Sequence, residues 1–256
     1  DSKVVVLPGK GDGTLGTRTE FATGTGPLSV AIGDLNGDGH SDLVTANAGS
    51  DSVSVLLGNG DGTFGTRTDF PTGAAPYSVA IEDLDGDGHP DMATANYLAA
   101  SVSVLLGEGD GTFGATTDLA TGAISRSVAI EDLDGDGHLD LVTANRDYAS
   151  VSVLLGEGDG TFGAKTDFGT AHFPSCVTIG DLNGDGHPDL AAANNGSWTV
   201  SVLLGNGNGT FGAGRRFPAG PSPVELAIGD LDGDGHLDLA VANGNSDTVS
   251  VLLGSG

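Results

Sequence analysis

The 256-residue sequence predicts an all-β fold built from a repeated unit. The segment DLNGDGHSD at 34–42 returns at 83–91, 132–140, 181–189 and 230–238 with only small changes, always 49 residues further on. Internal periods of 20–50 residues are typical of solenoids, propellers and arrays. The chain contains 45 Gly and 10 Pro, yet short apolar runs recur between them, which indicates strands joined by tight turns.

Each repeat contains four predicted strands, which we name a, b, c and d. In the second repeat they cover 78–83 (SVAIED), 91–96 (DMATAN), 101–106 (SVSVLL) and 113–119 (FGATTDL), each rich in β-branched or apolar residues and bounded by Gly, Asp or Asn. Four antiparallel strands form one blade of a β-propeller. The sequence therefore predicts a single β-propeller domain over 1–256 with five blades. A calcium-binding β-helix, which repeats about every nine residues, fits this period less well.

The two ends of the chain complicate the closure of such a ring. Residues 4–7 (VVVL) and 249–253 (VSVLL) are both copies of strand c, so the chain begins with c and d and ends with a, b and c. The simplest closure completes the last blade with the N-terminal strand d, and two copies of strand c then compete for one place. A segment of a longer array would show the same pattern.

The a–b loops are predicted cation sites. The formal charge is −26, and about half of the 35 Asp and Glu side chains lie in these nine-residue loops. Carboxylates this close repel unless something neutralises them, and oxygen ligands at alternate positions suit Ca²⁺, which takes 6–8 oxygens. In the first loop, Asp34, Asn36, Asp38 and Asp42 would supply side-chain oxygens and His40 its backbone carbonyl.

The same reasoning predicts one Ca²⁺ per loop, five in total, as the only cofactor. The predicted ligands are Asp34, Asn36, Asp38, His40, Asp42, Asp83, Asp85, Asp87, His89, Asp91, Asp132, Asp134, Asp136, His138, Asp140, Asp181, Asn183, Asp185, His187, Asp189, Asp230, Asp232, Asp234, His236 and Asp238.

Two different kinds of metal site fit these loops less well. An EF-hand places a bidentate Glu at position 12 between two helices, whereas position 12 is Thr, Ala or Val here and a predicted strand follows. Mg²⁺ prefers a tighter octahedron that keeps several waters. Asp-Gly turns without any metal remain the structural alternative.

The pattern D-x-[DN]-G-D-G-x-x-D between strands, followed by VSVLLGNGDGTFG as at 53–65, resembles the FG-GAP or VCBS repeat. Such repeats occur in integrin α-subunit propellers, in many secreted bacterial proteins and in some fungal lectins. The resemblance covers nearly the whole chain. It implies a β-propeller with Ca²⁺ held between the first two strands of each blade, and a secreted or extracellular location. The better-known members have seven blades, whereas this chain has five calcium loops.

The loops at the two ends of the strands differ in variability. The a–b loops and c–d turns are nearly identical among repeats, whereas the b–c loops and d–a connectors differ, and antiparallel pairing places these two variable sets on one face. We call it the variable face. Aromatic and Arg residues on loops above a rigid scaffold are typical of binding surfaces, although loops that no metal constrains also vary freely. The predicted ligand-binding residues are Tyr77, Tyr97, Arg126, Arg146, Tyr148 and Trp198, with His172 and Phe173 beside them.

Several functions are not expected. The five loop histidines would offer Ca²⁺ only a carbonyl, which turns the imidazoles outward, so a transition-metal ring is not predicted. No G-x-S-x-G, H-E-x-x-H or phosphate-binding motif occurs, and we expect no enzymatic activity. The acidic surface argues against nucleic acid, and the sequence has no apolar run long enough for membrane insertion and no signal peptide at its start. Cys176 is the single cysteine, so the redox compartment stays open.

The sequence thus predicts a calcium-binding extracellular recognition module that binds carbohydrate or protein through its variable face. The alternative is a structural spacer, or a near-symmetric repeat scaffold, with no ligand beyond Ca²⁺. The sequence does not decide the oligomeric state.

Overall fold

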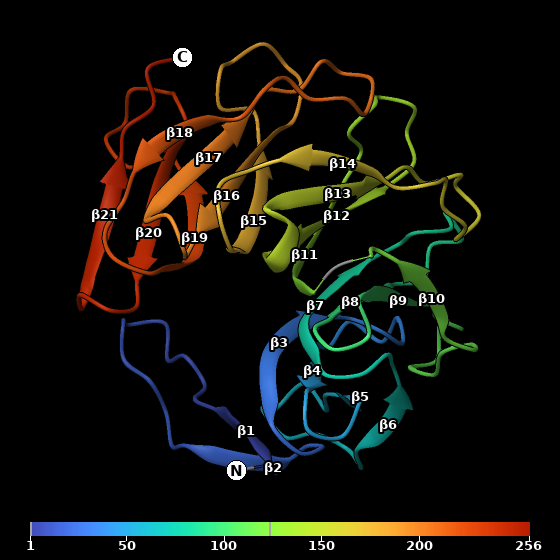
Figure 1. The fold of residues 1–256 in the computed structure, drawn as a ribbon. Helices are drawn as coiled ribbons and strands as arrows, with labels where there is room; N and C mark the ends of the chain where they lie inside the picture. Colours follow the sequence, from blue (N-terminus) through green and yellow to red (C-terminus); the bar gives the residue numbers. More distant parts are fainter. Residues whose placement is uncertain (1, 123) are drawn as a thin grey trace. The chain divides into compact units, whose positions relative to one another are not determined.

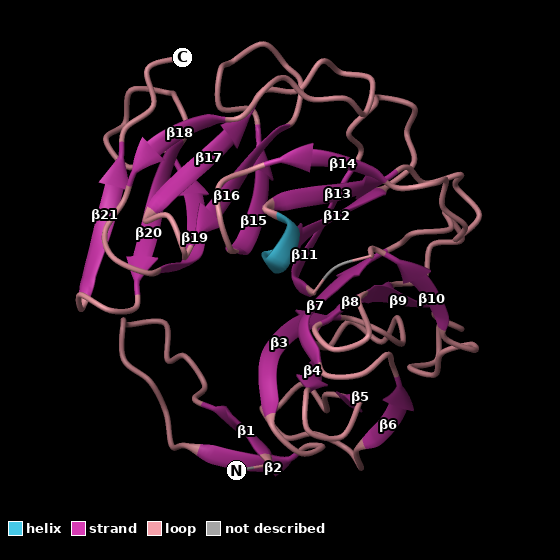
Figure 2. Cartoon of the chain, in the orientation of Figure 1, coloured by secondary structure: helices cyan, strands magenta, loops and turns pink. Residues whose placement is uncertain are grey.

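The computed structural model describes residues 2–122 and 124–256, and strands dominate it, as Figures 1 and 2 show. Within these residues the one helical element is a short 3-10 turn, η1 (Arg146–Tyr148). The all-β prediction is therefore confirmed. None of the described helical segments is long and apolar enough to span a bilayer.

The chain divides into two compact units. Unit 1 comprises the residues up to Asp83 together with Asp87–Leu119, and unit 2 comprises Leu84–Gly86 and Ala120–Gly256. The prediction of one domain over 1–256 stays a prediction, and each unit is described by itself below.

Unit 1 contains the two-stranded sheet β1-β2 and the four-stranded sheets β3-β4-β5-β6 and β7-β8-β9-β10, the last strand of which ends at the unit boundary. The strands are β1 (Lys3–Val6), β2 (Thr19–Ala22), β3 (Pro27–Gly33), β4 (Asp42–Asn47), β5 (Ser52–Leu56), β6 (Thr68–Pro71), β7 (Pro76–Glu82), β8 (Asp91–Asn96), β9 (Ser101–Leu105) and β10 (Thr117–Ala120).

Unit 2 contains the four-stranded sheets β11-β12-β13-β14 and β15-β16-β17-β18 and the three-stranded sheet β19-β20-β21. The strands are β11 (Ser125–Glu131), β12 (Asp140–Asn145), β13 (Ser150–Leu154), β14 (Thr166–Gly169), β15 (Pro174–Gly180), β16 (Asp189–Asn194), β17 (Thr199–Leu203), β18 (Arg215–Pro218), β19 (Pro223–Gly229), β20 (Asp238–Asn243) and β21 (Thr248–Leu252). Such antiparallel a-b-c-d sheets fit the blades of a β-propeller.

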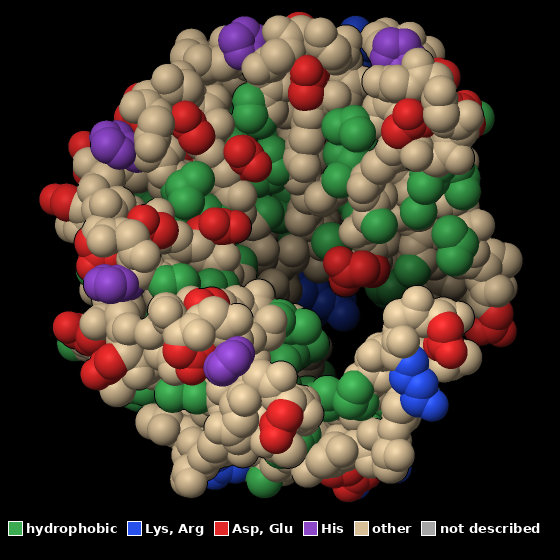
Figure 3. All heavy atoms as spheres, turned by 180° about the vertical axis from the view of Figure 1, so that it is seen from behind, with side chains coloured by type: hydrophobic (Ala, Val, Ile, Leu, Met, Phe, Trp, Pro, Cys, Tyr) green, Lys and Arg blue, Asp and Glu red, His purple; other side chains and the backbone are tan. Residues whose placement is uncertain are grey.

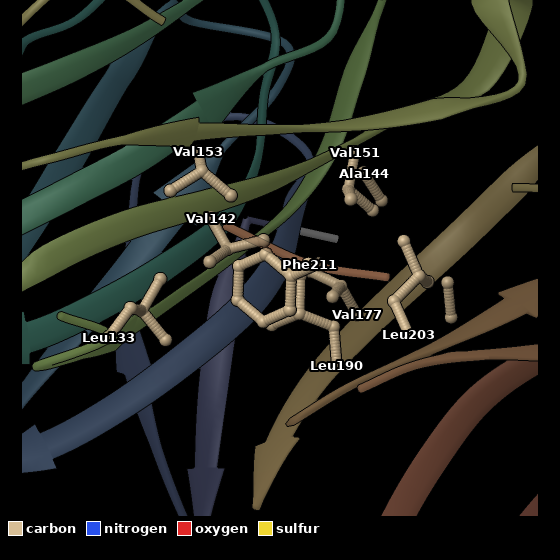
Figure 4. Close-up of a cluster of buried hydrophobic side chains, with 10 residues drawn as sticks. Leu133, Val142, Ala144, Val151, Val153, Val177, Leu190, Leu203 and Phe211 are labelled. Atoms are coloured by element: carbon tan, nitrogen blue, oxygen red, sulfur yellow. The ribbon is translucent and has the colours of Figure 1, made fainter. Parts of the chain in front are cut away.

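The core lies between neighbouring sheets of the same unit. Strands b and c are largely buried, as in β16 and β17, because their small and β-branched side chains pack into apolar clusters on both faces of the sheet. In unit 2, Phe211 of the turn between β17 and β18 packs into a cluster with Leu133, Val142 and Leu190, drawn in Figure 4. The Phe113 ring fills the equivalent place in unit 1. The c–d turn aromatics are therefore packing anchors at these two positions.

Two details differ from the sequence prediction. Strand d of the second repeat begins at Thr117 and not at 113, because Phe113 forms an isolated bridge with Gly107 and turns into the core. The N-terminal strand d, β2, pairs with β1 and does not complete the last sheet. Since β1 and β2 are neighbours in sequence, their pairing closes only a short loop and costs little chain entropy.

Candidate metal centres and the variable face

The five a–b loops share one backbone geometry. The N–H of the residue at position six donates to the Asp at position one in every loop, as from Gly137 to Asp132 (2.9 Å). The N–H at position seven donates to the Asp at position five, as from His138 to Asp136 (2.8 Å). Gly135 and Gly137 have φ of 78° and 90°, a left-handed conformation that glycine adopts readily, and so curl the loop around its carboxylates.

Carboxylate oxygens converge inside the loops. Two groups of three residues each place one oxygen per residue within 4.8 Å of the others: Asp132, Asp134 and Asp136 in one loop, and Asp230, Asp232 and Asp234 in another. In unit 1, Asp83 and Asp91 approach each other within the same limit. These donors are hard oxygens without nitrogen or sulfur, so the loops fit Ca²⁺ better than a transition metal. The prediction of bound Ca²⁺ itself stays a prediction.

Two loops carry Asn at position three in place of Asp. The Asn36 amide donates to Asp38 (3.0 Å), and the Asn183 amide donates to Asp185 (2.9 Å). Hydrogen bonds, first from the histidine backbone N–H and then from the amide, hold the pKa of Asp38 and of Asp185 below the ordinary value. These loops therefore have one formal charge fewer, and position five stays ionised in both.

The Asp at position nine, a predicted ligand, is buried in all five loops and also has a structural role. In the third loop, Asp140 accepts hydrogen bonds from the N–H groups of Leu133 (2.8 Å) and Gly156 (2.7 Å). Burial raises the pKa of Asp140 to about 6, against the effect of these bonds. This carboxylate ties the a–b loop to the start of the c–d turn.

The glycine at the start of the c–d turn is the partner that sequence reasoning missed. Its N–H donates to the Asp at position nine in all five repeats, at 2.6–2.7 Å. A Cβ on Gly156 would lie 2.3 Å from the carbonyl oxygen of Leu139, so only glycine fits this close approach. The signal in the sequence was the unchanging Gly after each VLL segment.

The loop histidines cover the c–d turns. A Cβ on Gly109 would lie 2.4 Å from the His89 imidazole, and the same proximity recurs in the other four repeats. Figure 3 shows histidine side chains at the surface near Asp and Glu side chains. The imidazoles thus have a packing role, whereas the predicted contribution of their carbonyls to Ca²⁺ stays a prediction.

The b–c loops and the d–a connectors contact each other at the same end of each sheet, as the predicted variable face requires. The N–H of Tyr97 donates to the carbonyl of Ala75, and that of Asn195 donates to the carbonyl of Phe173. Equivalent bonds join these two kinds of segment in each of the other three-stranded or four-stranded sheets.

In unit 1, Tyr77 and Tyr97 are half-buried because their rings stack at 4.5 Å with an interplanar angle of 20°. Tyr77 lies at a β-bulge of β7, between the paired residues Pro76 and Ser78. A bulge redirects the side chain that it carries. Tyr97 is a predicted ligand-binding residue, and the stack leaves only one face of its ring for a ligand.

In unit 2, aromatic and cationic side chains lie on three segments: η1, the connector before β15, and the loop between β16 and β17. Tyr148 is 69 % exposed, Trp198 57 % and Phe173 43 %. The Arg146 guanidinium lies over the Phe173 ring at 5.1 Å from its centroid. Arg126 is half-buried at the bulge of β11.

Backbone strain is found on the variable face as well. The last residue of each b–c loop has a positive φ: Asp51, Ala100, Ala149, Trp198 and Asp247. A bulky residue is rare in this conformation, and Trp198 adopts it at φ 58°. Phe173, exposed on the connector before β15, has a similar φ of 57°, so two of the exposed aromatics of this face are held in a left-handed conformation.

The chain matches the family described as FG-GAP-like repeat. The matched segments are 1–45, 34–94, 83–143, 132–192 and 181–241. No match was found among curated proteins.

Several solved structures share the fold. An Agrocybe aegerita lectin with specific recognition of non-reducing terminal N-acetylglucosamine is 22 % identical, with a TM-score of 0.66 over 100 % of this chain and 75 % of that chain. A putative 6-phosphogluconolactonase from Bacteroides uniformis is 16 % identical, with a TM-score of 0.63 over 98 % of this chain and 82 % of that one. BBS1N in complex with ARL6DN is 13 % identical, with a TM-score of 0.59 over 91 % and 69 %. Identities this low show the fold alone.

Proposed function

We propose that this chain, which belongs to the FG-GAP-like repeat family, is a calcium-stabilised extracellular module that binds carbohydrate through the variable face of unit 2. The observation that carries the proposal is the difference between the two ends of each sheet. One end holds near-identical carboxylate loops, and the other end holds dissimilar loops that carry, in unit 2, the exposed Tyr148, Phe173 and Trp198.

Calcium is the first part of the proposal. Asp132, Asp134 and Asp136 would bind Ca²⁺ through their converging oxygens, and the ion would offset their mutual repulsion. The loops lack the bidentate Glu of a high-affinity EF-hand, so the affinity expected is that of extracellular modules, roughly 10⁻⁴–10⁻³ M. Such sites fill in extracellular fluid, which supports a secreted or cell-surface location.

Carbohydrate is the ligand class that the aromatic residues favour. Tyr148, Phe173 and Trp198 offer apolar ring faces with polar edges, and Arg146 adds hydrogen-bond donors beside them. The recognition of N-acetylglucosamine by a lectin of the same fold supports this choice. We propose no catalytic role, since the acids of the loops would be occupied in binding Ca²⁺.

A glycan array read with Ca²⁺ and with EDTA tests the proposal, beginning with glycans that end in N-acetylglucosamine. Once a ligand is found, Trp198→Ala should weaken binding by about 1–2 kcal/mol, roughly tenfold, as expected for an aromatic anchor. Leu98→Ala is the matched control, since Leu98 is 70 % exposed on a b–c loop of unit 1. Calcium stoichiometry should be the same in both variants.

The alternative is a spacer with Ca²⁺ as its only ligand. It is favoured if no glycan binds, or if the triple variant of Tyr148, Phe173 and Trp198 to Ala binds as tightly as the parent chain. A calcium stoichiometry of one or two per chain, measured by titration calorimetry, would contradict the metal part of the proposal.

A further inference from the structure

Two arginines of the third repeat stand at positions that hold stacked tyrosines in the second repeat. Arg126 and Arg146 lie 49 residues after Tyr77 and Tyr97. The backbone matches at the two places, because Arg126 and Tyr77 each lie within a bulge of their strand. The N–H of Arg146 and that of Tyr97 also donate to equivalent connector carbonyls, at 3.0 and 2.9 Å. The two arginine side chains therefore start from adjoining positions at one end of the sheet β11-β14.

The charge of this pair is specific to the third repeat. The corresponding pairs of the first, fourth and fifth repeats are uncharged: Leu28 with Ala48, Ser175 with Asn195, and Val224 with Gly244. Two cations at adjoining positions repel each other, as like charges opposite one another in a sheet do. The repeat itself does not require arginines here, and an anion bound by both of them would remove the repulsion.

The variable segments of unit 2 are not acidic, although the whole chain is. These b–c loops and d–a connectors are 120–126, 145–150, 169–175, 194–199, 218–224 and 243–248. Their acids are Asp147 and Asp247, and the two charges of Arg126 and Arg146 balance them, so their formal charge is zero, compared with −26 for the chain. Exposed charges more than about 8 Å apart are largely screened at physiological ionic strength. An anionic ligand is therefore not repelled locally at this face.

The Phe173 ring holds Arg146 in place. The Arg146 guanidinium lies over this ring, 5.1 Å from its centroid. The ring packs against Gly196, where a Cβ would lie 2.4 Å from it. The N–H of Asn195 donates to the carbonyl of Phe173 (2.9 Å), and the N–H of Gly196 donates to the carbonyl of His172 (3.1 Å). Because the connector is fixed to the loop, Arg146 loses less conformational freedom when it binds a ligand.

The neighbouring acid forms only a distant ion pair with Arg146. The Asp147 Oδ1 atom lies 3.9 Å from the Arg146 Nη1 atom, which is beyond hydrogen-bond distance. The Arg146 side chain is 36 % exposed, and Tyr148, two residues further on, is exposed as well. A guanidinium is a planar fork of N–H donors that fits a carboxylate in bidentate geometry. An oxyanion can therefore reach Arg146 beside an aromatic ring that suits a sugar.

We propose that Arg126 and Arg146 together bind an oxyanion carried by the glycan, a carboxylate or a sulfate, while Tyr148 stacks on its sugar ring. This ligand class rests on the proposed carbohydrate function and narrows it to acidic sugars. Hydrogen bonds from a guanidinium to an oxyanion are charge-assisted and roughly twice as strong as neutral ones. The acidic group thus contributes both affinity and selectivity.

Matched pairs of glycans on an array test the ligand class. Glycans that end in glucuronic acid are compared with glycans that end in glucose, and those that end in N-acetylglucosamine 6-sulfate with those that end in N-acetylglucosamine. With Ca²⁺ and low salt, the acidic member of at least one pair should bind roughly tenfold more tightly than its neutral partner. Added salt should reduce this preference through screening. The pair that shows the preference distinguishes a carboxylate from a sulfate.

Variants of the two arginines test the site. The double variant Arg126→Tyr, Arg146→Tyr removes both cations and recreates a pair that the second repeat accommodates as a ring stack. Its melting curve checks that it is folded, and its preference for the acidic glycan should fall to about none, a loss of roughly tenfold. Arg146→Gln should reduce the preference as well. Arg18→Gln is the matched control, because it removes the same charge from an exposed arginine of unit 1.

The outcomes separate this ligand class from the proposed function. Equal binding of the acidic and neutral glycans by the parent chain would overturn the acidic class and leave the carbohydrate function standing. Binding of no glycan at all would contradict both. A preference that survives in the folded double variant, or that Arg18→Gln reduces as much as Arg146→Gln does, would show that the two arginines do not recognise the oxyanion.

Discussion

Replacement of Asp140 tests whether the acid at position nine holds the fold together independently of calcium. Its carboxylate is 1 % exposed and accepts the N–H groups of Leu133 and Gly156, which lie on two different loops. Asp140→Ala leaves both donors without a partner. Asp140→Asn keeps one acceptor oxygen and sets an amide NH₂ against the other N–H.

The expected loss follows from these bonds. A hydrogen bond to a charged group contributes about 1.5–3 kcal/mol, so two would contribute roughly 3–6 kcal/mol. Burial raises the pKa of Asp140 to about 6, so the ionised form is itself disfavoured there. The expected loss of stability therefore lies at the lower end of this range. We expect Asp140→Ala to lower the free energy of unfolding by about 3 kcal/mol and Asp140→Asn by about half of that.

Urea unfolding in EDTA measures this loss with the metal removed. Asp136→Asn is the control, because Asp136 is exposed and accepts only the His138 N–H among the bonds described. It should change stability in EDTA by less than about 1 kcal/mol while it weakens Ca²⁺ binding at the third loop. If Asp140→Ala unfolds in EDTA at the same urea concentration as the parent chain, the structural role assigned to this carboxylate is wrong.

Three further predictions concern other positions. Gly156→Ala should lower the free energy of unfolding by about 1–3 kcal/mol, because the new Cβ would lie 2.3 Å from the carbonyl oxygen of Leu139. An unchanged melting temperature would contradict this prediction. Asn36→Asp adds a carboxylate to the first loop, so calorimetry should show tighter Ca²⁺ binding there, while stability in EDTA falls through added repulsion. Burial, with the nearby Glu225 carboxylate, raises the pKa of Cys176 to about 12, so almost no thiolate forms at pH 8. A thiol reagent should therefore react with Cys176 only after urea is added. Rapid reaction of the native chain would show that the thiol is not buried.

The sequence by itself determined the repeats, the order of the strands and the carboxylate-rich loops between them. These features depend on local chemistry: Asp34 and Asp38 are four residues apart, Gly37 and Gly39 set the turn between them, and the 49-residue period multiplies the signal. A pattern of this kind can be seen without knowing which segments meet, because the residues that form each loop are neighbours in the chain.

The tertiary structure alone decided which distant residues meet. It paired Asp140 with Gly156, stacked Tyr77 on Tyr97, and paired β2 with β1 and not with the last sheet. In each case, several segments of similar sequence could make the same contact, as the two copies of strand c show. Packing and chain connectivity select the partner, and the local pattern of residues reveals neither of them.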